Sequence, residues 1–479
     1  MLEHILRRMT FGASPELMTY WADVPETQVV SQLLNYESQP ADVDSKINNP
    51  AYAGVTTRGQ FSPDTVINDA RQRWLFRMIH TQRPLEEKMA LFWHNHFATA
   101  YSKVAGAFGA VHGAKMMDAN PANFNRAFKG QIHLFRDYAT GNFRDLLIEV
   151  AKDPAMIVWL DGRTNTRTRP QENFGREIME LFTMGLGHYT EQDVYAAARV
   201  FTGWNIQLLG DRADQVNSYY AFQYQANNHD TNAKEFTFAI FPDGSRTIPA
   251  RAAAAGMQDG IDFINALARH PATAQRLANK LWRFFVNEIT PPDGTVINQI
   301  AQAYLSSNFS IKAMLQRIFL SDEFLTRSTF QRYSWPVEYV TRAIKEMGWN
   351  GLSVDTAITP LANMGQQLFE PPDVNGWELG PGWISTSSML SRMNFSSTLA
   401  GNQKFNLARD AQPYRQSPER VLSYLLNRFP TMGFSSTATA AMLEYLKAGP
   451  AWSGSDTQLQ TKTAGLARLI VGAGEYQFN

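Results

Sequence analysis

Amphipathic periodicity recurs along the chain, and it constrains the fold more than any other feature. Residues 84–97, PLEEKMALFWHNHF, open with a proline, and apolar residues follow at spacings of three and four. Proline is favoured in the first turn of a helix, and this spacing places side chains on one helical face. Similar patterns occupy residues 141–153, 270–286, 310–324, 335–348, 417–429 and 437–449. The sequence therefore predicts a mainly α fold, a large multi-helix domain.

Residues 204–248 depart from helical spacing. They contain SYYAFQYQ and EFTFAIF, in which apolar and polar residues alternate. Such alternation is typical of a β-strand with one buried face. We therefore expect a small β-hairpin excursion around 204–248.

The organisation of the chain is predicted from its helical runs and its loops. Residues 1–290 are expected to form the main helical domain with the motif regions, and residues 291–479 a C-terminal helical part packed on it. One continuous domain is the alternative. Residues 40–72 and 365–395 are rich in polar residues, Pro or Gly, and are predicted as long loops.

Charge and composition exclude several classes of site and partner. Lys plus Arg and Asp plus Glu number 44 each, so the formal net charge is zero and nothing favours a nucleic-acid partner. The chain has no cysteine, which excludes disulfides, thiolate nucleophiles and Cys-zinc sites. No apolar run reaches the roughly 18 residues of a transmembrane segment, and the N-terminus lacks a signal-peptide pattern. We expect a cytoplasmic protein, or one whose chain starts after a removed leader.

The stretch 169–204 is the richest in candidate catalytic groups. Its first part is predicted as a helix, with Glu177 at the edge of the apolar stripe. Gly-Leu-Gly at 185–187 should end this helix, and Thr190 should cap the next one in a capping-box arrangement. The hairpin brings Glu177 and His188 to one cleft wall. Ordinary salt bridges between two packed helices are the alternative interpretation.

His94 and His96 stand one residue apart at the end of a helical run. On a helix they point about 200° apart and cannot bind the same ion, so chelation requires the helix to end near Asn95. A neutral histidine bonded to a backbone carbonyl or a glutamate at a helix end is the favoured interpretation.

Two loop regions supply further candidates. His229 and Asp230 form either a capped turn or an acid/base pair over a cleft. Trp377 and Trp383 lie in a Pro/Gly-rich loop, where they are either exposed platforms for sugar rings or buried anchors.

These motifs resemble a known family, the bacterial domain-of-unknown-function family numbered 1800. The resemblance is collinear and extends to about residue 400. It rests on HILRRMTFGASPEL (4–17), PLEEKMALFWHNHFAT (84–99), GNFRDLLIEVAKDPAMIVWLDG (141–162), ENFGREIMELFTMGLGHYTEQDVYAAARVFTGW (172–204), HD (229–230), HPATAQRLANKLWRFFV (270–286) and QQLFEPPDVNGW (366–377). The motif positions that carry over are His94, His96, Glu172, Asn173, Arg176, Glu177, Glu180, His188, His229 and Asp230.

The resemblance implies a setting and no established activity. Family members are commonly exported, which implies a periplasmic or extracellular location. They are often encoded beside a sulfatase-like protein, which implies such a partner and a polysaccharide or another sulfated or phosphorylated polymer as substrate. The residues themselves leave a cytoplasmic location open.

The favoured functional hypothesis is a hydrolase-like enzyme that acts on a carbohydrate polymer. Glycoside cleavage needs two carboxyl groups about 5–10 Å apart, and Glu177, at the apolar boundary, is the better general acid. The predicted catalytic residues are Glu172, Glu177, Glu180, His94 and His188. The predicted substrate-binding residues are Asn173, Arg176, Trp204, His229, Asp230, Trp377 and Trp383.

Two alternatives remain at this point. The first is a non-catalytic envelope or export-linked binding or scaffold protein, whose polar motifs are buried ion pairs that hold helices in register. The second is a metal-assisted hydrolase that uses His94 or His96 with Glu177 and Asp230. No cofactor is expected except a divalent metal in this last case.

Overall fold

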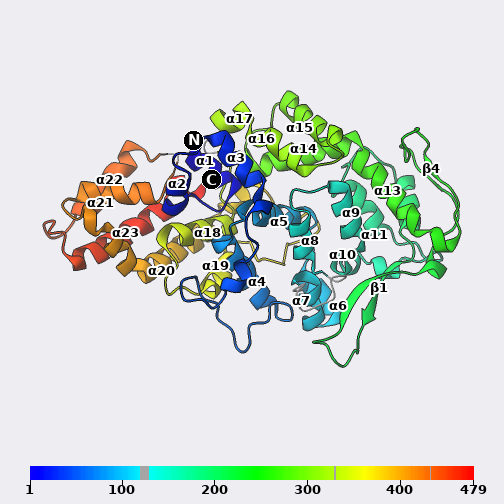
Figure 1. Ribbon diagram of the computed structural model, residues 1–479, viewed down its shortest axis with the longest axis horizontal. Coiled ribbons are helices and arrows are strands. Elements are labelled where there is room, and N and C mark those ends of the chain that lie inside the picture. The colour runs from blue at the N-terminus through cyan, green and yellow to red at the C-terminus, as the bar shows by residue number, and fades with distance from the viewer. Residues whose placement is uncertain (119–128, 328–330, 432) are drawn as a thin grey trace.

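Helices dominate the computed structural model, which describes residues 1–118, 129–327, 331–431 and 433–479 (Figure 1). The predicted mainly α class is confirmed. The helices before the strands are α1 Leu2–Met9, α2 Pro15–Trp21, α3 Glu26–Leu34, α4 Ile67–His80, α5 Pro84–His96, α6 Tyr101–Phe108, α7 Ala110–Asp118, α8 Gln131–Asp137, α9 Phe143–Lys152, α10 Pro154–Trp159, α11 Glu172–Glu180 and α12 Glu191–Val200. The later helices are α13 Met257–Arg269, α14 Pro271–Phe285, α15 Gly294–Ser306, α16 Ile311–Phe319, α17 Asp322–Arg327, α18 Pro336–Met347, α19 Ile358–Asn363, α20 Thr386–Ala411, α21 Pro418–Arg428, α22 Ser436–Lys447 and α23 Asp456–Gly472.

The strands form two small antiparallel sheets in the described chain. β1 (Trp204–Leu209) pairs with β2 (Tyr219–Tyr224), and β3 (Lys234–Glu235) pairs with β4 (Thr247–Ile248). The excursion around 204–248 is thus present, with SYYAFQYQ as its second strand. EFTFAIF, in contrast, is mostly irregular. Its alternating Phe236 and Phe238 are buried because they pack near Phe263 of α13, and the N–H of Phe236 donates to the Arg246 carbonyl at 3.0 Å just beyond the β3–β4 ladder.

Helix boundaries follow from local capping chemistry. Pro84 and Pro271 are the first residues of α5 and α14. An N–H at this position would have no carbonyl acceptor within the helix, so proline costs no hydrogen bond there. Ser417 accepts from the N–H of Arg420 at 3.3 Å and caps α21.

Three predicted boundaries are corrected by the structure. Residues 310–324 form two helices and not one, because Ser321 accepts from the N–H of Phe324 at 3.2 Å and starts α17. The predicted loop over 365–395 ends at Ser385, whose hydroxyl caps α20. Helix α4 likewise begins at Ile67, within the predicted loop over 40–72.

The ends of the chain meet on α18. Arg342 of this helix donates to the Phe478 carbonyl at 3.0 Å, and a Cβ at Gly12 would lie 3.0 Å from its side chain. Figure 1 shows α20 to α23 at one end of the molecule and the β1–β2 hairpin near the other. Helices α14 and α15, on either side of the predicted boundary near residue 290, pack together, and the two-part division stays a prediction.

Buried ion pairs hold the central helices in register. Glu87 of α5 accepts from Arg77 of α4 at 2.5 Å and from Arg136 of α8 at 3.0 Å. The neighbouring Lys88 pairs with Glu338 of α18 at 2.9 Å. Removing one partner of such a pair leaves an uncompensated buried charge, so these contacts specify how the helices pack. None of the described helices has the length and apolarity to span a bilayer, as the sequence predicts.

Candidate functional site

An open cleft of about 800 Å³ lies between the end of α11 and the first turns of α14, and we call it the cleft. Glu180 contributes from α11, His188 from the following turn and His270 from the cap of α14. Three amide side chains also line it. The full lining is Glu180, Leu181, Met184, Gly185, Leu186, His188, His270, Pro271, Ala272, Gln275, Arg276, Asn279 and Asn375. The predicted residues Glu180 and His188 therefore share one solvent-open hollow.

Hydrogen bonds orient the titratable groups of the cleft. The Tyr189 hydroxyl donates to Glu180 Oε2 at 2.5 Å, which holds the carboxylate in place. The rings of His188 and His270 lie 5.9 Å apart, centroid to centroid. His270 Nδ1 accepts from the N–H of Ala272 at 3.2 Å, so its proton is on Nε2. Burial, followed by the nearby His188, lowers the pKa of His270, which favours a neutral ring.

A cationic wall comes from the exposed side of α14. Arg276 Nε donates to the Leu181 carbonyl at 3.3 Å, and the guanidinium forms no ion pair with any residue that the structure describes. Gly185, with φ +84°, permits this approach, because a Cβ there would lie 3.1 Å from Arg276 Nη1. Lys280 lies one turn on, and burial followed by the charge of Arg276 lowers its pKa to about 7.

Glu177 lies beside the cleft and does not line it. Its side chain is half-buried and forms no hydrogen bond with the described residues. Burial, followed by the charge of Glu180, raises its pKa. The cleft opens at the end of α11, so the glutamate that lines it together with His188 is Glu180, three residues further along the helix, and not Glu177.

The other polar groups of α11 fasten the helix to its neighbours. Arg176 makes two hydrogen bonds of 2.7 Å to Glu191 of α12 and lies 3.5 Å from Glu172. Asn173 donates to Asp161 at 3.1 Å. None of these residues lines the cleft, so the structure does not join Glu172, Asn173 and Arg176 to the predicted site. The predicted capping box of α12 at Thr190 is confirmed.

His94 and His96 are core residues on opposite sides of α5. His94 Nε2 accepts from the N–H of Phe369 at 3.2 Å, while His96 Nε2 donates to the Phe182 carbonyl at 3.0 Å. Burial lowers the pKa of His94 to about 3, so its ring is neutral. Helix α5 continues to His96 and places the two rings on different sides, so they do not face a shared ion, and a catalytic role for His94 stays a prediction. The helix-end bond to a carbonyl is confirmed for His96.

The two predicted sugar platforms, Trp377 and Trp383, are buried, and so is the predicted substrate-binding Trp204. Trp204 packs against Gly260, where a Cβ would lie 2.3 Å from the indole. Trp377 contacts the His94 ring, and Trp383 contacts Trp335. Exposed platforms are therefore wrong, and buried anchoring is the correct alternative, because each indole fills a gap between elements and is at most 5% exposed.

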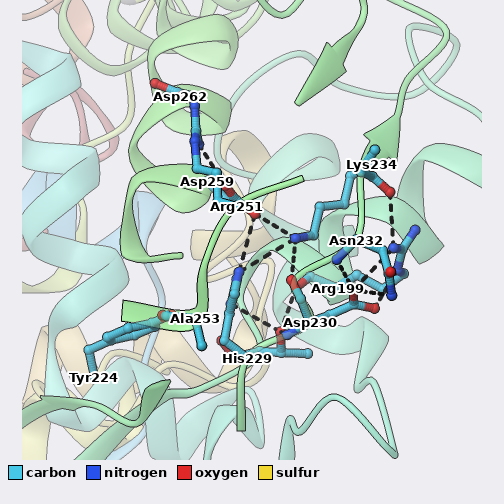
Figure 2. Close-up of polar contacts among 12 residues, drawn as sticks. Arg199, Tyr224, His229, Asp230, Asn232, Lys234, Arg251, Ala253, Asp259 and Asp262 are labelled. Carbon is cyan, nitrogen blue, oxygen red and sulfur yellow. Dashed lines mark hydrogen bonds and ion pairs between the residues drawn. The ribbon is translucent and has the colours of Figure 1, made fainter. Parts of the chain in front are cut away.

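His229 and Asp230 belong to a polar network below the β-hairpin, drawn in Figure 2. His229 Nδ1 donates to the Thr202 carbonyl at 2.8 Å, and its Nε2 lies 3.2 Å from Asp259 of α13. Lys234 of β3 pairs with the same carboxylate at 2.5 Å. Asp230 forms two hydrogen bonds with Arg199 of α12, at 2.7 and 3.2 Å.

This network is structural in its geometry. His229, Lys234 and Asp259 are all buried, and a Cβ at Gly256 would lie 2.1 Å from the His229 ring. None of these three residues lines the cleft. His229 and Asp230 use their polar atoms in contacts that tie the hairpin to α12 and α13, and their predicted substrate-binding roles stay a prediction.

No group of three or more His, Asp and Glu able to hold a metal is found in the described residues. The set proposed for a metal-assisted hydrolase is dispersed. His94 contacts Phe369, His96 contacts Phe182, and Asp230 is paired with Arg199.

The sequence matches one protein family over nearly its whole length. The family model, described as a protein of unknown function (DUF1800), aligns with residues 4–478. The chain belongs to the DUF1800 family. The resemblance inferred from the motifs is thus confirmed and extends past residue 400. No curated protein and no solved structure matches this DUF1800 chain.

Sequence reasoning missed the contribution of α14 to this DUF1800 cleft. Gln275, Arg276 and Asn279 lie on one polar side of an amphipathic helix, and this stripe is visible in HPATAQRLANKLWRFFV. The stripe indicates a surface-facing side and carries no information about the element opposite. Asn375, in a loop nearly a hundred residues further on, lies within the motif QQLFEPPDVNGW, which does not indicate that the loop faces α14.

Proposed function

We propose that the chain is a hydrolase-like enzyme that acts on a carbohydrate polymer in the cleft. The observation that carries the proposal is one open cleft lined by a carboxylate, two histidines and an arginine, namely Glu180, His188, His270 and Arg276. Acid/base groups in a solvent-open hollow are the arrangement that hydrolysis requires.

Glu180 is the one carboxylate in the lining of the cleft, so in this proposal a histidine replaces the second carboxyl group, and Glu180 and His188 divide the acid/base work. The Glu180 carboxylate takes a proton from water as the water oxygen attacks the anomeric carbon. The glycosidic C–O bond breaks, and protonated His188 gives its proton to the leaving oxygen. Glu177 lies beside this pair and outside the cleft, and burial followed by the charge of Glu180 raises its pKa.

The amide groups of the cleft support a polyhydroxylated substrate. Gln275, Asn279 and Asn375 line the hollow. An amide donates through its nitrogen and accepts through its oxygen, so it matches a sugar hydroxyl, which does both. An open cleft also suits a polymer, whose chain must extend beyond the reacting residue.

The test compares Glu180→Gln with two other carboxamide variants of the same helix. Wild-type protein is incubated with a panel of polysaccharides, and the release of reducing ends is measured. Glu180→Gln should abolish release with an unchanged melting temperature. Glu172→Gln, an exposed position outside the cleft, should retain it. Glu177→Gln, also outside the cleft, should retain release as well. Equal activity of wild type and Glu180→Gln, or no release from any polymer, would contradict the proposal.

A non-catalytic scaffold or binding protein is the second candidate, and a specific observation favours it. Four of the family motif positions, His94, His96, His229 and Asp230, are engaged in contacts between elements. This candidate expects a polysaccharide to bind wild type and Glu180→Gln equally, with no product from either.

The setting of the protein is also part of the proposal. Export to the periplasm or the cell exterior, and a sulfatase-like partner that acts on the same polymer, rest on the family resemblance. Fractionation of the native cells with an antibody against this chain tests the location. Co-purification of a sulfatase-like protein tests the partner.

A further inference from the structure

A second hollow, of about 300 Å³, lies beside the N-terminal helices, and we call it the amine pocket. Leu17 and Trp21 from α2 and Leu33 from α3 give it an apolar side. Polar residues also line it, namely Thr10, Gln32, Gln39, Thr81 and Gln82. Lys345 of α18 is the one cationic side chain in its lining. The amine pocket shares no lining residue with the cleft.

Lys345 has no partner for its ammonium group in the described structure. Its residue is 8% exposed, and it forms no hydrogen bond and no ion pair with any described residue. The adjacent Glu346 is already engaged, because it accepts from Arg342 at 3.0 Å and from the Tyr476 hydroxyl at 2.6 Å. Glu16 of α2 lies on the exposed surface and forms no ion pair with Lys345.

This lysine differs from the other buried amines. Lys88 pairs with Glu338, Lys234 pairs with Asp259, and Lys115 donates to three carbonyls. An isolated ammonium in an apolar surrounding is costly, and proteins almost always pair it. An anion brought by a ligand would supply the missing partner at Lys345.

We propose that the amine pocket binds a small apolar carboxylic acid, whose carboxylate pairs with Lys345 and whose tail lies against Leu17, Trp21 and Leu33. A hollow of this size is at the small end of ligand sites, which are typically apolar with few polar groups that fix orientation. One ammonium without an arginine fork suits a singly charged carboxylate better than a phosphate.

The test compares octanoate with octanol on the full-length protein. The two probes have the same apolar chain and differ in the headgroup. Isothermal titration calorimetry at pH 7 should give octanoate an affinity about tenfold to 100-fold higher, the range expected for one charge-assisted hydrogen bond. Equal affinities, or no binding of octanoate, would overturn the proposal.

Lys345→Met separates the ammonium from the apolar pocket. Methionine keeps the length of the side chain and removes its charge, so the preference for octanoate should vanish while octanol binds as before. Lys404→Met, at an exposed lysine, should leave both affinities unchanged. A Lys345→Met protein that keeps the preference for octanoate would contradict the assignment.

A labelling measurement remains decisive if Lys345→Met does not fold. Wild-type protein is methylated with formaldehyde and a borohydride reductant, and the modification of Lys345 is followed by mass spectrometry. Octanoate should protect Lys345 and octanol should not, while Lys404 is modified equally in both samples. Modification of Lys345 at the same rate with and without octanoate would overturn the proposal.

The dependence on pH gives an independent readout. Burial lowers the pKa of Lys345 to about 8, opposed in part by Glu16 and Glu346, and His80 of α4 also faces this amine. The ammonium is therefore present at pH 7 and is lost above pH 8. Octanoate binding should weaken across that range, and octanol binding should stay constant.

Discussion

The Nζ atom of Lys280 lies 3.1 Å from Nδ1 of His96, so a lysine of α14 contacts the last residue of α5. The same amine donates to the Leu181 carbonyl at 3.4 Å, and His96 donates to the Phe182 carbonyl. Two side chains thereby fix the turn that follows α11. That turn carries the wall of the cleft, so the geometry around Glu180 depends on a buried pair behind it.

Lys280→Met should change how the stability depends on pH. Burial lowers the pKa of Lys280 to about 7, below the ordinary lysine value of 10.5. Between these values the folded state binds fewer protons than the unfolded state, so this lysine makes stability rise with pH. The variant should lack that rise. Urea unfolding at pH 7 and pH 10 measures it, with Lys404→Met as the exposed control. If the free energy of unfolding of the variant depends on pH as that of wild type does, the lowered pKa of Lys280 is contradicted.

His94→Ala should destabilise the fold and not merely reduce activity. The substitution opens a cavity between Trp74, Phe369 and Trp377 and leaves the Phe369 N–H without its acceptor. We expect a loss of about 2–5 kcal/mol in the free energy of unfolding. His94→Gln, which can present an acceptor near the position of Nε2, should recover part of it. Unchanged stability with lost activity would instead support a catalytic His94.

The helices could be predicted from the sequence because their signals are local. Pro84 and Pro271 mark helix starts, and Thr190 and Ser417 are caps whose chemistry lies within four residues. The cleft could not be predicted in full. Lys280 lies 184 residues from His96 along the chain, and no periodicity specifies which helix faces which.

The sequence also does not show whether the aromatic and polar motif residues are buried or exposed. The sequence around a tryptophan in a proline-rich loop does not show whether its side chain stacks on a sugar or anchors the loop. In the structure, the Trp377 ring packs against His94. In the sequence, His229 and Asp230 are consistent with an acid/base pair. In the structure, Asp230 pairs with Arg199, and His229 lies beside Asp259. These contacts join residues of different helices and strands, so only the packed structure shows whether such residues line a cleft or hold elements together.

Asp153→Asn should stabilise the protein at alkaline pH. Asp153 caps α10 by accepting from the N–H of Met156 and also accepts from Gln131, and burial raises its pKa to about 7. The folded state therefore binds more protons than the unfolded state between about pH 4 and pH 7, and stability falls as pH rises through this window. Asparagine keeps the acceptor and carries no charge. Unfolding at pH 8 should show a gain on the order of 1 kcal/mol, and unfolding at pH 4 none.

Asp259→Asn and Lys234→Met should each be strongly destabilising, and less than additive together. Asp259 is the carboxylate shared by Lys234, Arg251 and His229, so its neutralisation leaves the buried Lys234 ammonium without its carboxylate, while Arg251 keeps its pair with Asp262. Each single change should cost about 3–5 kcal/mol, because one half of a buried pair remains. The double variant removes both charges and should cost clearly less than the sum, a coupling that urea unfolding of all four proteins measures. Asp262→Asn, at a carboxylate that bonds the outer Arg251 and Gln258 and not Lys234, is the matched control and should cost much less. Additive losses would mean that Lys234 and Asp259 contribute to stability independently. A variant with full stability but altered polysaccharide release would support a functional role for this network.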